Sequence, residues 1–217
     1  MQLAKINMKS HHYSVMNELW SAVTHGVGIM LAITALVLLA IKGALSGSVL
    51  ETVALVGFGI SLVVLYTAST LFHALYFTKA RKVFQVLDHS SIYILIAGSY
   101  LPYSLLAIGG THGIVLLATI WALCLTGVLL DCFFVGRFKK LEVGIYVLLG
   151  WLCLTGMSAL WASLGAGGFF LLLSGGVAYT LGALLYLRPN TPYIHVIWHM
   201  FVMLGSACMF CSIYFFI

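Results

Sequence analysis

The chain has 217 residues, of which 63% are hydrophobic and only 7% are charged. A water-soluble domain is about half apolar and about a quarter charged, so this composition excludes a soluble enzyme, a disordered chain and a small disulfide-stapled domain. The net charge of +5 leaves nucleic-acid binding open until the positions of the basic residues are considered.

Apolar segments follow one another along the whole chain, each long enough to cross a hydrocarbon core of about 30 Å as a helix. They are continuous rather than alternating, which favours helices over barrel strands. The first contains His25 and is followed by further apolar segments, so we interpret it as a retained span rather than a signal peptide. The sequence predicts an all-α integral membrane protein, a single seven-transmembrane helix bundle over residues 1–217, with spans at about residues 20–41, 50–77, 84–108, 113–134, 143–163, 166–187 and 193–217.

Short connections separate these predicted spans. Polar loops are expected at residues 42–51, 78–82 and 136–142, and glycine-rich turns at residues 109–111 and 165–168. Residues 188–192 interrupt the last two spans, where we expect Thr191 to cap the seventh helix and Pro192 to occupy its first turn.

The basic residues are distributed unevenly over the connections. When the connections are assigned alternately to two sides, nine of the ten lysines and arginines fall on the side of the N-terminus, and only Lys42 falls on the other. This bias predicts a cytoplasmic N-terminal arm over residues 1–16 and a C-terminus outside the cell. The cations are therefore orientation signals and contacts for anionic lipids, so we expect membrane lipids as partners and no nucleic acid.

Ionisable residues inside membrane spans are rare and mark functional sites by default. In this chain they gather, together with one serine, at the predicted cytoplasmic ends of four spans: Glu18, His25, Ser69, His73, Asp88, His195 and His199. Because the predicted topology places all four ends on one side, these side chains are expected at one depth of the membrane.

His195 and His199 are four residues apart, which places both imidazoles on one helix face, a spacing that suits a metal ion. His73 at matching depth supplies a third ligand. Three neutral histidines around zinc leave a fourth position for a water molecule, which zinc makes acidic. Asp88 could deprotonate or orient that water, and Ser69 could donate to a developing oxyanion. The alternative is a hydrogen-bonded polar cluster that stabilises the bundle.

Other residues carry weaker signals. His89 points about 100° away from Asp88 on a helix, so we expect it at the membrane interface, and His112 is expected at the outer face. The five cysteines are scattered through the spans and are interpreted as buried apolar residues. Gly175 and Gly182 predict close helix packing in the sixth span.

Four motifs carry a resemblance to a known family. They are Glu18 with Thr24-His25-Gly26, Ser69-x-x-x-His73, Asp88 leading into Gly98-Ser99-Tyr100-x-Pro102, and His195-x-x-x-His199. In this order they resemble the hemolysin III proteins, the bacterial branch of the progestin and adipoQ receptor family, which includes the adiponectin receptors. The resemblance runs from about residue 17 to the C-terminus. It implies seven helices, a cytoplasmic N-terminus and a multi-pass location in the bacterial inner (plasma) membrane.

The resemblance also implies a site. A zinc ion would be held by His73, His195 and His199, with Asp88 near the metal-bound water and Ser69 beside it. Glu18 and His25 match a family motif, and we expect them to support the ligands by packing or hydrogen bonding.

The function implied by the resemblance is hydrolysis of a lipid. The wider superfamily includes alkaline ceramidases, and lipid amide hydrolysis is attributed to the receptors. We therefore expect a zinc-dependent hydrolase of lipid amides or esters, with a substrate in the cytoplasmic leaflet and a role in membrane lipid homeostasis. Two alternatives remain: a non-enzymatic receptor or regulator with a structural zinc, and a cytolytic pore, to which the family name refers.

Overall fold

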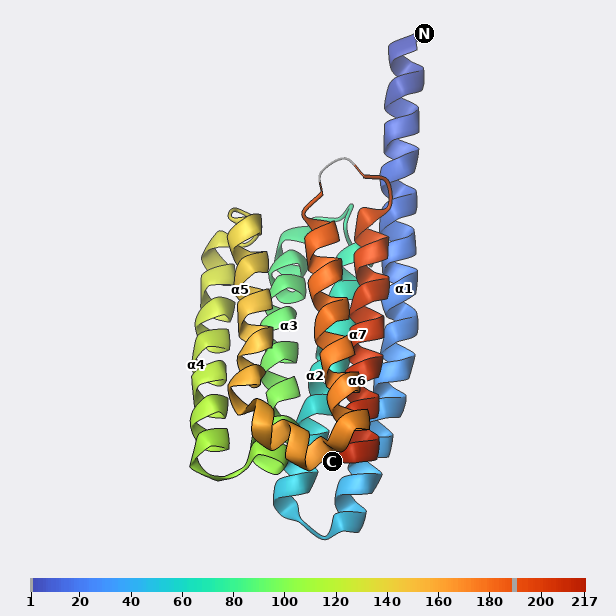
Figure 1. Cartoon of the computed structure of the whole chain (residues 1–217). Coiled ribbons are helices and arrows are strands. Elements are labelled where there is room, and N and C mark those ends of the chain that lie inside the picture. Colours follow the sequence, from blue (N-terminus) through green and yellow to red (C-terminus); the bar gives the residue numbers. More distant parts are fainter. Residues whose placement is uncertain (1, 189–190) are drawn as a thin grey trace.

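The computed structural model of the chain is a bundle of helices (Figure 1). It describes the backbone of residues 2–188 and 191–217 and the side chains of residues 13–188 and 191–217, and this part of the chain contains no strand. The helices are α1 (Gln2–Ser46), α2 (Val49–Ala74), α3 (Arg81–Pro102), α4 (Gly110–Phe134), α5 (Lys139–Trp151), α6 (Met157–Tyr186) and α7 (Ile194–Phe216). A π-helical segment, Tyr103–Ile108, follows α3, and a 3-10 segment, Leu152–Gly156, joins α5 to α6.

Six helical stretches in the described chain are long and apolar enough to cross a membrane. The stretch Lys139–Tyr186 has 48 residues and contains both α5 and α6. A straight helix of that length would extend about 70 Å, more than twice the hydrocarbon thickness. Figure 1 shows α5 and α6 as separate ribbons, joined by an oblique helical segment at one end of the bundle. The prediction of an all-α membrane protein is confirmed.

Side chains on the two faces of the helices differ as a lipid environment requires. Large apolar residues such as Met30, Leu45 and Phe133 are exposed on the outside of the bundle, whereas Phe58 and Ile213 are completely buried inside it. An apolar outer surface of this extent is incompatible with water but suits hydrocarbon chains, and helices satisfy their own backbone hydrogen bonds there. Lipid contact and interior packing together therefore account for the bundle.

The region predicted as the fifth span, residues 143–163, differs from the structure. The helix ends at Trp151, the 3-10 segment follows, and α6 begins at Met157. A further break lies at Gly165, where φ is +59° and the backbone is not helical. The glycine-rich turn expected at residues 165–168 is thus a bend within α6, and the segment between the two breaks is the oblique one.

The two ends of the bundle carry different loops. The loops after α2, α4 and α6 lie at the end from which α1 projects, which we call the N-terminal end of the bundle (Figure 1). The loops after α1 and α3 and the C-terminus lie at the opposite end. The expected N-terminal arm is helical from residue 2 onward and continues into the first apolar segment without a break.

The start of α7 corrects the predicted cap. The first helical residue is Ile194 and the capping position is Tyr193, not Thr191, so Pro192 lies before the first turn. Tyr193 has a left-handed backbone, with φ at +54°, and its N–H donates to the hydroxyl of Tyr13 in α1 at 2.7 Å. A contact between distant helices sets this boundary. Pro189 and Asn190, part of the same predicted turn, lie outside the described residues.

Candidate metal centre

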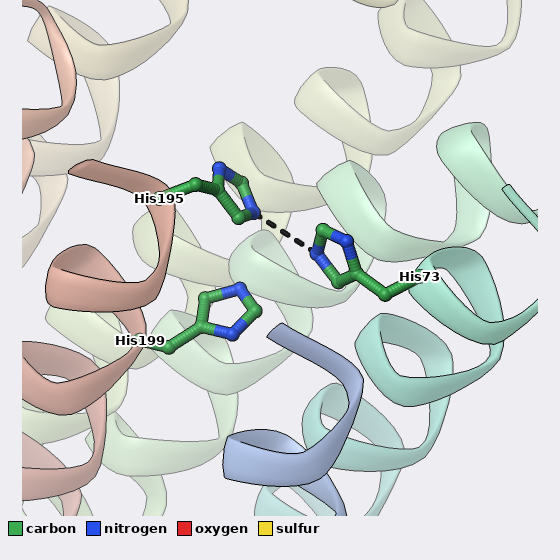
Figure 2. Close-up of side chains that lie close together, drawn as sticks. All are labelled: His73, His195 and His199. Atoms are coloured by element: carbon green, nitrogen blue, oxygen red, sulfur yellow. Dashed lines mark hydrogen bonds between the residues drawn. The ribbon is translucent and has the colours of Figure 1, made fainter. Parts of the chain in front are cut away.

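Three histidines from two helices converge near the N-terminal end of the bundle. His73 lies in the last turn of α2, and His195 and His199 lie in the first two turns of α7. Figure 2 shows the three imidazoles turned toward one another. One nitrogen of each lies within 4.8 Å of the others, His73 and His199 are buried, and His195 is half-buried. This group could hold a metal ion.

The spacing of the nitrogens fits a zinc-like ion. Nε2 of His73 and Nε2 of His195 are 3.0 Å apart, the contact dashed in Figure 2. Two nitrogens bound to one tetrahedral zinc at 2.0–2.1 Å lie about 3.3 Å apart. Only a small adjustment of the rings separates the two arrangements. Neutral imidazole nitrogens also suit zinc, copper, nickel and iron.

Helix α1 orients two of the three imidazoles. Nδ1 of His73 lies 2.6 Å from Oε2 of Glu18, and Nδ1 of His199 donates to the backbone carbonyl of Ser21 at 3.1 Å. The hydroxyl of Thr24 is a further 3.2 Å neighbour of that His199 nitrogen. Because a carbonyl only accepts, Nδ1 of His199 carries the proton and Nε2 keeps its lone pair. Such partners on the second nitrogen are typical of metal-binding histidines.

His25 lies against the three histidines without joining them. Its ring stacks on that of His199, with centroids 3.5 Å apart and planes inclined by 10°, and Tyr66 meets its other side edge-on. His25 is only 3% exposed, and neither of its ring nitrogens has a hydrogen-bond partner. A buried polar group without a partner is costly, so the environment of His25 favours a ligand that completes its hydrogen bonding.

A cavity of about 40 Å³ adjoins the histidines. His25, His195 and His199 line one side of it, and Ser69 of α2 and Asp88 of α3 lie beside them. Ser69 is buried and faces Asp88. A single water needs roughly 10–15 Å³ of such space, so the cavity has room for small polar species. The residues selected from the sequence as metal ligands, base and hydroxyl donor therefore lie together.

Two further residues of the cavity wall, His89 of α3 and Glu142 of α5, were not selected as site residues from the sequence. Nδ1 of His89 lies 3.5 Å from Oε2 of Glu142, whose Oε1 accepts from the backbone N–H of Gly136 at 3.1 Å. Next along α3, the hydroxyl of Ser90 donates to the buried Asp131 of α4 at 3.5 Å. We call His89, Asp131 and Glu142 the acidic cluster.

His89, which was expected at the membrane interface, does not face the outside of the bundle. Its side chain is only 14% exposed, because Glu142 holds it inside the bundle. A signal for this cluster was present in the composition: Asp131 and Glu142 are two of only five acidic residues in the chain. Glu142 was expected in the loop at residues 136–142, but it lies in the first turn of α5.

A second, apolar cavity of about 100 Å³ borders the first. The two cavities share wall residues from four helices: Leu65, Ile92, Tyr146, Trp198 and Val202. The second cavity extends between α3, α5, α6 and α7 toward Met209, with mostly apolar side chains around it. Polar and apolar spaces are therefore adjacent, as a molecule with a polar group and a hydrocarbon chain requires.

Comparisons with known proteins cover most of the chain. The protein-family model described as "Haemolysin-III related" matches residues 13–210. Hemolysin-3 homolog of Bacillus subtilis (strain 168) is 41% identical, over 94% of this chain and 96% of its own. Hemolysin-3 of Bacillus cereus is 42% identical, over 94% and 93%. Monocyte to macrophage differentiation factor of Homo sapiens is 27% identical, over 72% and 67%. No solved structure matches the chain.

Proposed function

The chain belongs to the haemolysin-III-related family of multi-pass membrane proteins, and from that premise we propose that it is a zinc-dependent hydrolase of lipid amides. One observation carries the proposal. Two of the three histidines that could hold a metal ion, His195 and His199, line a cavity together with Asp88 and Ser69, and that cavity borders an apolar one. A metal site, a base and a hydrocarbon-lined space are the parts that hydrolysis of a membrane lipid needs.

The proposed topology has seven crossings, with α5 and α6 as separate ones, a cytoplasmic N-terminus and the C-terminus outside. Two observations support it. Lys139–Tyr186 is too long for one crossing, and the basic loops after α2, α4 and α6 lie at the N-terminal end of the bundle (Figure 1). Positively charged loops face the cytoplasm. The site would then take its substrate from the cytoplasmic leaflet of the bacterial inner membrane.

In this proposal His73, His195 and His199 hold zinc, and Glu18 and Ser21 keep the rings of His73 and His199 in position. Bound zinc supplies Lewis acidity, which polarises a carbonyl group and makes a coordinated water acidic. The donor set supports this assignment because three neutral imidazoles leave a position open for substrate or water.

The remaining chemistry belongs to Asp88 and Ser69. The Asp88 carboxylate accepts a proton from the attacking water and passes it to the amide nitrogen as the carbon–nitrogen bond breaks. The Ser69 hydroxyl donates a hydrogen bond to the carbonyl oxygen as negative charge develops there. The acyl chain lies in the apolar cavity, which excludes bulk water and fixes the carbonyl at the polar end.

Ser69→Ala tests this assignment, with Ser61→Ala as the matched control. Both serines are buried in α2, but Ser61 bonds only to the carbonyl of Phe58 and does not line the cavity. Purified protein is assayed for fatty acid release from a panel of N-acyl lipids, with zinc content measured on the same samples. We expect Ser69→Ala to lower the rate about 100-fold at unchanged zinc content, and Ser61→Ala to retain the wild-type rate.

The same assay separates the alternatives. Wild-type protein that contains zinc but releases no fatty acid from any lipid would contradict the hydrolase and favour a receptor or regulator with structural zinc. Conductance in reconstituted bilayers that survives His199→Ala would favour a pore.

A further inference from the structure

The cavity beside the histidines has walls of opposite chemical character. The α1 and α7 side presents the imidazoles of His25, His195 and His199, whereas the α3 and α5 side presents Asp88, His89 and Glu142. None of the described residues that line the cavity is a lysine or an arginine. With a divalent metal on the histidines, the cavity would carry positive charge at one end and carboxylates at the other.

The Glu142 carboxylate has capacity for a further donor. One oxygen accepts from the N–H of Gly136 at 3.1 Å, and the other lies at a long 3.5 Å from Nδ1 of His89. The backbone N–H of Phe138 is a third contact of this carboxylate. A carboxylate has about four lone-pair sites, so these three contacts leave capacity for one more donor. The side chain is 11% exposed and borders the cavity. A hydrogen-bond donor in the cavity can therefore reach it.

The charges nearby favour a cationic donor. Asp131, 3% exposed, reinforces the negative potential of Glu142 and Asp88 from α4. Lys139, in the same turn as Glu142, places its ammonium 3.5 Å from the centroid of the Tyr186 ring and does not line the cavity. Ammonium–carboxylate hydrogen bonds are about twice as strong as neutral ones.

An independent observation points to a polar ligand in this space. His25 lines the same cavity, is 97% buried, and has no hydrogen-bond partner on either ring nitrogen. A purely apolar occupant would leave this imidazole unsatisfied, at a cost comparable to a lost hydrogen bond. The cavity therefore suits a ligand that carries hydrogen-bonding groups as well as charge.

We propose that Glu142, assisted by His89, binds the amine half of the cleaved lipid amide as a primary ammonium. The inference rests on the proposed function, and it adds the identity of the leaving group. Hydrolysis places the water oxygen on the acyl carbon and a water proton on the nitrogen. The acid then loses its remaining proton, and the amine gains one, which gives a carboxylate and an ammonium. The metal end of the cavity matches the carboxylate, and the α3 and α5 wall matches the ammonium.

A primary ammonium could also come from the headgroup of an aminophospholipid, and the test separates the two sources. Zinc-loaded full-length protein in phosphatidylcholine nanodiscs is titrated with dodecylamine, dodecanol and dodecanoate, after correction for partition into protein-free nanodiscs. We expect dodecylamine to bind more tightly than dodecanol. Glu142→Gln is expected to weaken dodecylamine binding roughly 10- to 100-fold, the usual effect of losing a charged hydrogen bond, and to leave dodecanoate binding unchanged.

Two control variants show whether weaker dodecylamine binding results from loss of the negative charge at residue 142. Glu142→Asp keeps the charge and should retain most of the affinity for dodecylamine. Glu51→Gln removes one negative charge at the opposite end of the bundle, in the first turn of α2, and should change nothing. Zinc content and unfolding temperature verify that each variant is folded. The comparison of dodecylamine with dodecanol in the wild type stands even if Glu142→Gln does not fold.

Equal affinity of the wild type for dodecylamine and dodecanol would overturn the inference, as would a Glu142→Gln protein that binds dodecylamine like the wild type. Displacement of dodecylamine by phosphatidylethanolamine in the nanodiscs would overturn the leaving-group assignment in favour of a headgroup site. Because binding needs no turnover, the outcomes are separable. If dodecylamine binding depends on Glu142 but the wild type hydrolyses no lipid amide, the proposed function is contradicted. If the wild type hydrolyses lipid amides but Glu142→Gln binds dodecylamine as tightly as the wild type, only this inference is contradicted.

Discussion

His195 and His199 border the same cavity as His89 and Glu142 of the acidic cluster, but the hydrogen-bond contacts of the two groups differ in length. Contacts that orient the histidines are short, with Glu18 at 2.6 Å from His73 and the Ser21 carbonyl at 3.1 Å from His199. In the acidic cluster, His89 and Glu142 are 3.5 Å apart. Metal coordination tolerates little error in ligand position, whereas a carboxylate with unused lone pairs can accept an organic cation. The short contacts of the histidines suit metal coordination, and the long contact between His89 and Glu142 suits a carboxylate that accepts a further donor.

Removal of a metal-binding histidine should have the largest effect on zinc content and on the rate of hydrolysis. His199→Ala deletes one of three nitrogens, so zinc content should fall from about one per chain to near zero. The rate of lipid hydrolysis should fall by at least about 10³-fold, because the metal contributes several kcal/mol. Metal analysis and a fatty acid assay measure the two effects. The control is His112→Ala, an exposed histidine in the first turn of α4 at the opposite end of the bundle; an equal loss of zinc there would contradict the assignment.

Asp88→Asn should separate metal binding from catalysis. The amide is nearly the same size but cannot accept the proton, so the rate should fall about 10²- to 10⁴-fold. Zinc content should stay near one per chain, because Asp88 is not among the three histidine ligands. Full hydrolytic activity in this variant would show that another group acts as the base.

Glu18→Ala tests whether the short contacts matter. Without the carboxylate, Nδ1 of His73 loses its partner, and zinc affinity should fall about 10- to 100-fold. Competition with a chelator of known zinc affinity measures this fall in zinc affinity. Glu51→Ala, which alters an acidic residue of α2 at the other end of the bundle, should leave zinc affinity unchanged; a similar drop in both would indicate a general effect of charge.

Thr24→Val should have the smallest effect. The hydroxyl is one of two neighbours of Nδ1 of His199, and the Ser21 carbonyl remains when it is removed. The loss should be about 1 kcal/mol, or roughly fivefold in zinc affinity by the same chelator competition. A loss as large as that of Glu18→Ala would make Thr24 the principal partner of His199.

The sequence predicted the metal side better than the acidic side for a physical reason. His195 and His199 are four residues apart, so their shared face follows from helix geometry alone. His73 was added because its predicted depth in the membrane matches theirs. The partner of Glu18 depends on how α1 packs against α2, which spacing does not give. His89, Asp131 and Glu142 come from three helices, and nothing in their spacing predicts that they meet.

The boundaries of the helices were also only partly predictable from the sequence. Continuous apolar composition located the membrane segments, and the glycines at residues 165–168 marked the bend at Gly165, but nothing in the composition marked the end of α5 at Trp151. The breaks depend on the 3-10 segment Leu152–Gly156 and on the positive φ of Gly165. Similarly, the residue before α7, Tyr193, is hydrogen-bonded to Tyr13 in α1, 180 residues away in the chain, a contact that local sequence does not predict.

The most direct test of the account is fatty acid release from N-acyl lipids by purified wild-type protein, followed through zinc removal and zinc re-addition. Fatty acid release should stop when a chelator has removed the zinc and should return when one zinc per chain is restored. Protein that carries one zinc per chain and releases no fatty acid from any lipid amide, or that releases it equally well without zinc, would contradict the central claim.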